Sequence, residues 1–235
     1  MHRCTRTAVI AVALAAGAPL VLNPAVAAAA PSAKQLVVDS IAATKTASSV
    51  HIVGSVSSKG QTIGLDVAAS NANEGQGLVS INGGTVKVVR LGQLVYFNAN
   101  AAFWTQSAGA SDAVFAGRWV SVPANGSDGK DFAQFLGTSA LFKQILTGTH
   151  LDESTFTLEP NTTIAGVAVY AIDGSNTSSG STGTIYIARK GKPYIVKLIT
   201  TSSAGAGELT FTDYNQPVHP AVPPHAVTLQ KLEAG

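Results

Sequence analysis

Residues 94–122 read LVYFNANAAFWTQSAGASDAVFAGRWVSV, and this stretch says most about how the chain folds. Two runs of β-forming residues flank a polar insert rich in Ala, Gly and Ser. Both tryptophans of the 235-residue chain and three of its eight phenylalanines lie here, although aromatic residues make up only 6% of the sequence. Such a concentration indicates either part of a hydrophobic core or the mouth of an apolar cavity.

Around this stretch, most of the chain alternates between apolar and polar residues, the period of β-strands. The turn sequence Asn82-Gly83 between two such runs predicts a β-hairpin. Strands at this spacing favour one large antiparallel sheet. The predicted strands are 50–57, 62–70, 77–82, 85–91, 93–98, 118–122, 154–159, 164–173, 183–189, 194–201 and 207–214.

Two segments instead show the period of an amphipathic helix. Residues 33–46 follow Ser32, a suitable N-cap, and residues 131–146 form a longer helix that Ser127 or Asp128 could cap. The proline-rich sequence QPVHPAVPPHAV at 216–227 predicts an extended closing segment.

The strands at 94–97, 164–172 and 194–199 are apolar on both faces, so one face of the sheet must be covered. The few predicted helices provide the only cover and are too few for so wide a sheet. We therefore predict an α+β fold: a single curved antiparallel half-barrel sheet of about ten strands, with helices packed on its concave face. The incomplete cover would leave a gap lined by Phe and Leu side chains.

Residues 1–27 have the pattern of a secretory signal peptide. Arg3 and Arg6 precede an apolar run at 8–22, and Ala25-Val26-Ala27 supplies a small-x-small cleavage site. We expect residues 28–235 to form one domain, secreted or periplasmic in the cell envelope and soluble after cleavage. Cys4, the only cysteine, lies in the predicted signal peptide, so we expect no lipid anchor, disulfide or cysteine metal ligand in the mature chain.

The charge balance excludes one class of partner. Two of the 15 Lys and Arg residues lie in the predicted signal peptide, whereas all 13 Asp and Glu residues remain, so the mature chain is close to neutral. Its charges are scattered and form no basic patch, so binding to nucleic acid is not expected.

The order of elements and several local sequences resemble the LolA/LppX–LprG superfamily of envelope lipid carriers. These sequences are TKTASSVHIVGSV at 44–56, the strand–insert–strand stretch 94–122, the aromatic helix 131–146 and LTFTDYNQPVHPAVPP at 209–224. The resemblance implies an open half-barrel that holds acyl chains between sheet and helices. It implies transport of an acylated lipid, glycolipid or lipoprotein acyl moiety by a monomer, with no enzymatic activity and no cofactor. An envelope membrane protein would act as donor or acceptor.

The candidate ligand-binding residues are the aromatic and leucine side chains of the insert and the central helix. Core packing is the alternative role for each of them, and both roles can hold together. We expect the polar headgroup of a ligand to stay near the 99–117 insert, with Phe103, Trp104 and Phe115 at the rim. The full set is Tyr96, Phe103, Trp104, Phe115, Trp119, Phe132, Phe135, Leu136, Phe142 and Leu146.

Two alternatives belong to other functional classes. A domain of this fold with a filled core could serve as an envelope structural or protein-interaction module that binds no lipid. A hydrolase is the weaker alternative, since Ser127-Asp128-Gly129-Lys130 matches S-x-x-K without its companion motifs. No metal site is expected, because no two histidines have a metal-ligand spacing.

Overall fold

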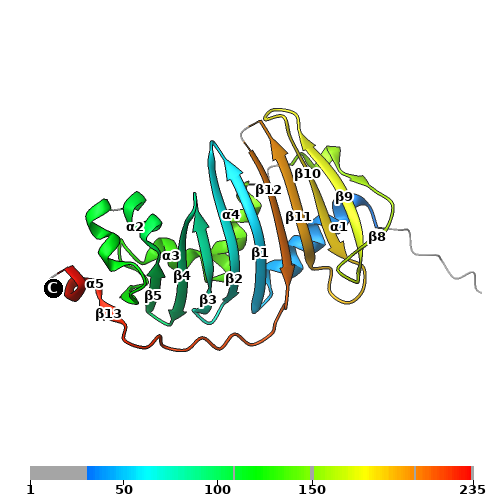
Figure 1. Ribbon diagram of the computed structural model, residues 1–235. Coiled ribbons are helices and arrows are strands. Elements are labelled where there is room, and N and C mark those ends of the chain that lie inside the picture. The colour runs from blue at the N-terminus through cyan, green and yellow to red at the C-terminus, as the bar shows by residue number, and fades with distance from the viewer. Residues whose placement is uncertain (1–30, 108, 149–150, 204, 234–235) are drawn as a thin grey trace, which may run out of the picture. The chain divides into compact units, whose positions relative to one another are not determined.

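The computed structural model describes residues 31–107, 109–148, 151–203 and 205–233 (Figure 1). The predicted signal peptide lies outside these residues and stays a prediction.

One open sheet dominates the described part of the chain, as the α+β prediction required (Figure 1). The order of its strands is β13-β6-β5-β4-β3-β2-β1-β12-β11-β10-β9-β7, and β8 also pairs with β9. All pairs are antiparallel except β13 with β6. The strands are β1 (Ser49–Ser58), β2 (Gln61–Ser70), β3 (Glu74–Ile81), β4 (Gly84–Leu91), β5 (Leu94–Ala99), β6 (Val120–Pro123), β7 (Thr157–Leu158), β8 (Thr162–Ile164), β9 (Val167–Asn176), β10 (Ser181–Ala188), β11 (Ile195–Ser202), β12 (Gly205–Thr212) and β13 (Val227–Thr228).

The described residues form 13 strands rather than about ten. The two-residue strand β13 is too short for its alternation to be recognised in a sequence. The predicted strand 154–159 was wrong for most of its length, because Glu153–Thr155 form a 3₁₀-helix and only Thr157–Leu158 (β7) pair with β9. The predicted strand 164–173 divides into β8 and β9, because Ala165 and Gly166 form a hairpin turn with φ of 47° and 84°. The predicted hairpin at Asn82-Gly83 is confirmed and joins β3 to β4, with φ of 48° and 88°.

The pairing of β1 with β12 joins the two halves of the sheet. These two strands lie more than a hundred residues apart in the chain. Gly54 of β1 lies opposite Leu209, and a Cβ atom at residue 54 would come within 2.0 Å of the Glu208 carbonyl oxygen. Glycine is therefore required for the two strands to approach this closely.

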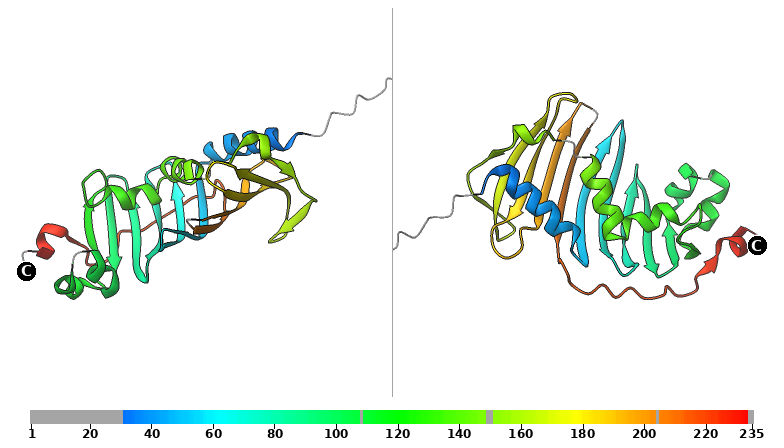
Figure 2. Two further views of the ribbon diagram at one scale, coloured as in Figure 1. Left: turned by 90° about the horizontal axis from the view of Figure 1, so that it is seen from above. Right: turned by 180° about the vertical axis from the view of Figure 1, so that it is seen from behind.

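Helices α1 (Ala33–Lys45), α3 (Lys130–Phe135) and α4 (Thr138–Gly148) lie on one face of the curved sheet, which we call the inner face (Figure 2). Helix α1 packs over β10 and β11, and α4 lies beside it. The Ser32 side chain accepts a hydrogen bond from the Gln35 N–H, which confirms the predicted N-cap. Helices α2 (Ala101–Ser107) and α5 (Leu229–Glu233) and two 3₁₀-helices (Ala110–Phe115 and Glu153–Thr155) complete the elements.

The predicted single helix 131–146 was wrong: it is two helices that meet at an elbow at Leu136-Gly137. At the elbow, the Leu136 carbonyl accepts a hydrogen bond from the Ser70 N–H of β2 (3.4 Å). Arg90 Nη1 donates to the Ala133 carbonyl (3.3 Å) and so caps the end of α3. Contacts with the sheet thus replace the intrahelical hydrogen bonds that an unbroken helix would have.

The predicted cap of this helix was also wrong. The N-cap of α3 is Gly129, with no side-chain hydrogen bond, and the Ser127 hydroxyl donates to the neighbouring Asp128 carboxylate at 3.1 Å. The turn 123–129 therefore begins the helix through its backbone, since the Ala133 N–H bonds to the Gly129 carbonyl.

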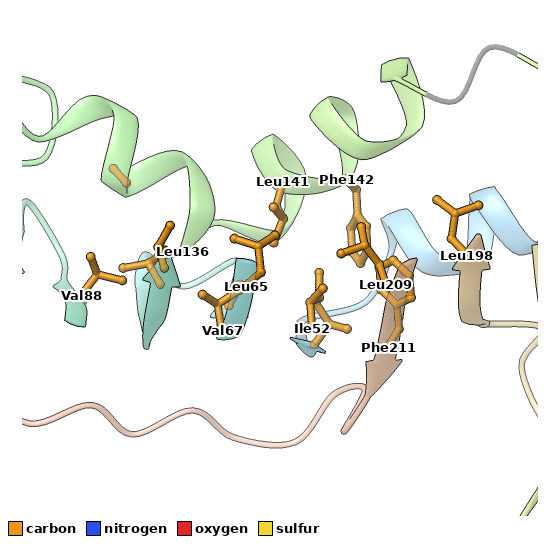
Figure 3. Packing of buried hydrophobic residues seen from close by; sticks show 14 of the residues in the cluster. Ile52, Leu65, Val67, Val88, Leu136, Leu141, Phe142, Leu198, Leu209 and Phe211 are labelled. Carbon is orange, nitrogen blue, oxygen red and sulfur yellow. The ribbon is translucent and has the colours of Figure 1, made fainter. Parts of the chain in front are cut away.

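Apolar side chains from β-strands across the sheet point toward the helices and form the core (Figure 3). The outer face carries ion pairs instead, including Lys197 with Glu208 at 2.7 Å and His51 with Asp66 at 2.7 Å. The strand pairing aligns one inner-facing row of residues: Ile172, Ile185, Leu198, Leu209, Gly54, Leu65, Val79 and Val86.

A polar cluster holds the end of α1 against β11. Thr44 Oγ1 accepts a hydrogen bond from the Ile195 N–H (3.2 Å), and the Tyr214 hydroxyl donates to the Ile195 carbonyl (2.7 Å). The Tyr214 ring stacks on Tyr194 with 4.2 Å between the ring centroids. Burial raises the pKa of the Tyr214 hydroxyl above its ordinary value.

Replacement of this tyrosine should change how stability depends on pH. The folded protein keeps the Tyr214 hydroxyl neutral, whereas the side chain of the unfolded chain ionises near about pH 10. The contribution of Tyr214 to the free energy of unfolding is therefore complete below about pH 10 and is lost as the pH rises above it. We expect the free energy of unfolding to fall more steeply above about pH 10 in the wild type than in Tyr214→Phe. Urea unfolding at a series of pH values measures this, and two parallel curves would contradict it.

The elbow residue should matter strongly for stability. Leu136 is 0% exposed, so Leu136→Ala should lower the free energy of unfolding by about 2–5 kcal/mol. The matched control is Leu158→Ala in β7, where the side chain is 47% exposed and the expected change is within about 0.5 kcal/mol. Urea denaturation of both variants checks the difference, and equal small effects would show that the elbow is not seated in the core.

Candidate functional site

An apolar cavity of about 190 Å³ lies between the inner face of the sheet and the helices α3 and α4. Its walls come from the central strands below and from the two helices above. Figure 3 shows this region, with Leu141 of α4 pointing toward the sheet and Leu198 and Leu209 pointing toward the helices. The lining residues are Val56, Ile63, Leu65, Phe135, Leu141, Ile145, Leu198, Thr200, Gly207 and Leu209.

Small residues on the inner face explain why space remains here. Gly207 pairs with Val56 on one side and with Thr200 on the other, and Thr200 pairs with Gly183. The next inner-facing row carries leucine at the equivalent positions of β11 and β12, Leu198 and Leu209. Gly207 and Thr200 therefore remove side-chain volume beneath the helices.

The cavity has a closed end and an open end. Leu209 and Leu141 are 3% and 1% exposed, whereas Val56 is 39% exposed. Beyond the closed end, the rings of Phe142 and Phe211 stack with 6.3 Å between centroids and fill the space toward α1. The cavity therefore opens toward solvent near Val56, close to the β1–β2 turn.

The chemistry of the cavity is almost entirely that of hydrocarbon. Among the described residues that line it, none is charged, and Thr200 contributes the one side-chain hydroxyl. Such walls bind apolar groups by excluding water and offer neither a nucleophile with a base nor a set of metal ligands. Across the described residues, no cluster of three or more His, Cys, Asp or Glu side chains could hold a metal ion.

The aromatic insert forms a separate, packed cluster over the β4–β5 end of the sheet. Trp104 lies at its centre, 5.9 Å from Phe97, 6.1 Å from Phe103 and 5.7 Å from Phe115 between ring centroids. Phe132 of α3 stacks on Phe97 at 5.2 Å. Trp104 is 7% exposed, and its Nε1 is buried with no hydrogen-bond partner among the described atoms.

The structure thus separates nine of the ten candidate residues into four groups. Phe135 lines the cavity, and Leu136 and Phe142 are buried in the neighbouring core. Phe103, Trp104, Phe115 and Phe132 belong to the aromatic cluster. Tyr96 and Trp119 lie on the outer face: Tyr96 pairs with Val89 and Ser121, and Trp119 borders a shallow outer depression with Lys87 and Val89. Leu146 has its side chain outside the described residues.

Sequence reasoning missed most of the cavity wall, because it selected large rings and the wall is aliphatic. The alternating apolar residues Val56, Ile63 and Leu65 were recognisable as one face of two strands. A better signal would have been the small residues at inner-facing positions, Thr200 and Gly207, since missing volume makes a cavity. The cavity opens near the β1–β2 turn, whereas the 99–117 insert, where we expected the headgroup, covers the β4–β5 end of the sheet.

No described helix is long and apolar enough to span a bilayer. No protein-family model matches the sequence, and no curated protein matches it.

Solved structures show what the fold resembles. The chain is similar to the lipoprotein LppX of Mycobacterium tuberculosis, with a TM-score of 0.52 and 19% sequence identity over 80% of this chain and 97% of that one. It is also similar to LprF of Mycobacterium bovis, with a TM-score of 0.50 and 18% identity over 83% of this chain and 97% of that one. The described chain therefore has the fold of LppX and LprF.

Proposed function

We propose that this protein binds the acyl chain of an amphiphile in the cavity under α4 and carries it through the cell envelope. The observation that carries the proposal is an apolar cavity, about 190 Å³ in volume and open at Val56, in the layer between sheet and helices. The fold shared with LppX and LprF supports the proposal, since the superfamily resemblance implies that acyl chains bind in this layer.

The energy available from the cavity is sufficient for reversible binding. A cavity of about 150 Å³ with aliphatic and aromatic walls holds one benzene molecule, so about 190 Å³ accepts roughly seven carbons. At about 0.8 kcal/mol per buried methylene, such a segment gains on the order of 5 kcal/mol before entropy costs. Contacts of the remaining chain with half-exposed residues at the mouth would add to this value.

Binding in this proposal is passive and includes no chemical step. Two hydrogen bonds tie the helices to the sheet at the elbow, from the Ser70 N–H to the Leu136 carbonyl and from Arg90 to the Ala133 carbonyl. Beside the cavity, α4 faces the strands through apolar side chains such as Leu141 and Ile145. Rotation of α4 about the elbow would therefore admit or release a chain without breaking a strand pair.

The cellular role follows from the predicted signal peptide. After cleavage near Ala27 the protein would work outside the cytoplasm without a lipid anchor, since Cys4 is removed with the signal. It would take its cargo from one membrane site and deliver it to another, with an envelope membrane protein as donor or acceptor.

Binding of a fluorescent fatty acid tests the proposal. We expect cis-parinaric acid to bind the mature chain, from Ala28 onward, saturably, and Val56→Asp to weaken this binding at least about tenfold, because a carboxylate at the mouth opposes entry of hydrocarbon. The matched control is Val53→Asp on the same strand. Val53 is 43% exposed, close to the 39% of Val56, but pairs with Asp66 and Thr210 on the outer face.

Circular dichroism would first establish that both variants are folded. If the wild type shows no saturable binding, the carrier proposal fails and the interaction-domain alternative takes its place. If both variants lose binding equally, the acyl chain does not bind in this cavity.

A further inference from the structure

We propose that the cavity accepts one acyl chain and excludes a second, so that the cargo is a single-chain amphiphile such as a fatty acid or a monoacyl lipid. This inference rests on the proposed function and specifies its substrate class. It follows from three features: the volume of the cavity, the filled space on both sides of it, and the position of its mouth.

The volume limits the cargo first. A space of about 190 Å³ holds roughly seven carbons by comparison with cavities that hold one benzene. That is about half of one long acyl chain. Two parallel chains would have to share the same space, and each could then bury only about three or four carbons. Each chain would therefore lose about half of the hydrophobic free energy that a single chain gains on binding.

On the β4–β5 side, aromatic rings occupy the space where a second chain would lie. Helix α3 directs Phe135 into the cavity and Phe132, one turn earlier, into the aromatic cluster. Leu136 lies beside them with 0% exposure. The rings of the cluster are 5.2–6.3 Å apart between centroids, which is the spacing of packed aromatic pairs. The layer under α2 and α3 is therefore filled.

On the α1 side, the core is closed in a similar way. Phe142 of α4 stacks on Phe211 of β12, and these residues are 2% and 3% exposed. Ile52 lies next to Phe211 in the strand register and is 0% exposed. A second chain could enter this side only by displacing both rings.

The mouth also accommodates a single chain. It lies near Val56, at the end of β1 and β2, where the strands turn through Lys59 and Gly60. The next inner-facing pair beyond Val56 is polar: Ser58 lies opposite Gln61, and both residues are exposed. A headgroup at this position has polar neighbours, whereas a second hydrocarbon chain left outside would remain in water.

Acylglycerols, which share the glycerol backbone and differ in how many of its hydroxyls carry an acyl chain, provide the test. Mono-, di- and tripalmitoylglycerol, presented in the same detergent micelles, would compete with cis-parinaric acid bound to the mature chain. We expect monopalmitoylglycerol to displace the probe at a concentration at least about tenfold lower than either of the others. The reason is that its one chain can enter the cavity, whereas the other two compounds would each leave at least one chain in water.

A variant that enlarges the cavity makes the test sharper. Phe135→Ala removes a ring of about the size of the benzene that such a cavity holds. In this variant, the concentration of dipalmitoylglycerol that displaces the probe should be within about threefold of that of monopalmitoylglycerol. The matched control is Phe156→Ala, which shortens another partly buried phenylalanine, beside Gly174 of β9 and outside both the cavity and the aromatic cluster, and should leave the preference unchanged.

The outcomes separate the two proposals. If di- or tripalmitoylglycerol competes as well as the monoacyl compound, or if none competes with a probe that binds saturably, the single-chain inference is overturned while acyl binding remains. If the probe itself does not bind, the proposed function fails.

Discussion

The position of Leu136 on the sheet is the constraint on which the rest of the structure depends. A Cβ atom at residue 75 would lie 2.9 Å from the Leu136 Cβ, so the absence of a side chain at Gly75 lets the elbow approach β3 this closely. The Ser70 N–H then satisfies the Leu136 carbonyl, and Arg90 gives the Ala133 carbonyl a second donor beside the Leu136 N–H. This anchor fixes where α4 begins and therefore which part of the inner face it covers.

The cavity follows from this arrangement, because α4 passes over the strand positions where side chains are smallest. Gly207 and Thr200 leave space that Leu141 and Ile145 only partly fill. Proteins usually remove such voids, since lost contacts cost stability. The proposed acyl chain would fill this apolar void, which opens to solvent beside half-exposed Val56.

The spacing of apolar residues predicted the sheet and α1, and the residue types typical of turns predicted the hairpin at Asn82-Gly83. Both signals are local in the sequence. The elbow could not be predicted, since its cause is Gly75 and Ser70, more than sixty residues earlier in the chain. The same holds for the cavity: Val56 and Gly207 meet only through the β1–β12 register, which no local pattern determines. The aromatic insert was recognisable as apolar, but its packing into a filled cluster depends on Phe132 of a distant helix.

A crystal structure with palmitic acid brominated at its terminal methyl group would test the central claim most directly, because anomalous scattering locates the bromine without reference to the protein density. The account predicts a single bromine site between Leu209 of β12 and Leu141 of α4, with the carboxylate near the β1–β2 turn. A bromine site within the aromatic cluster around Trp104, or on the outer face beside Trp119, would contradict it.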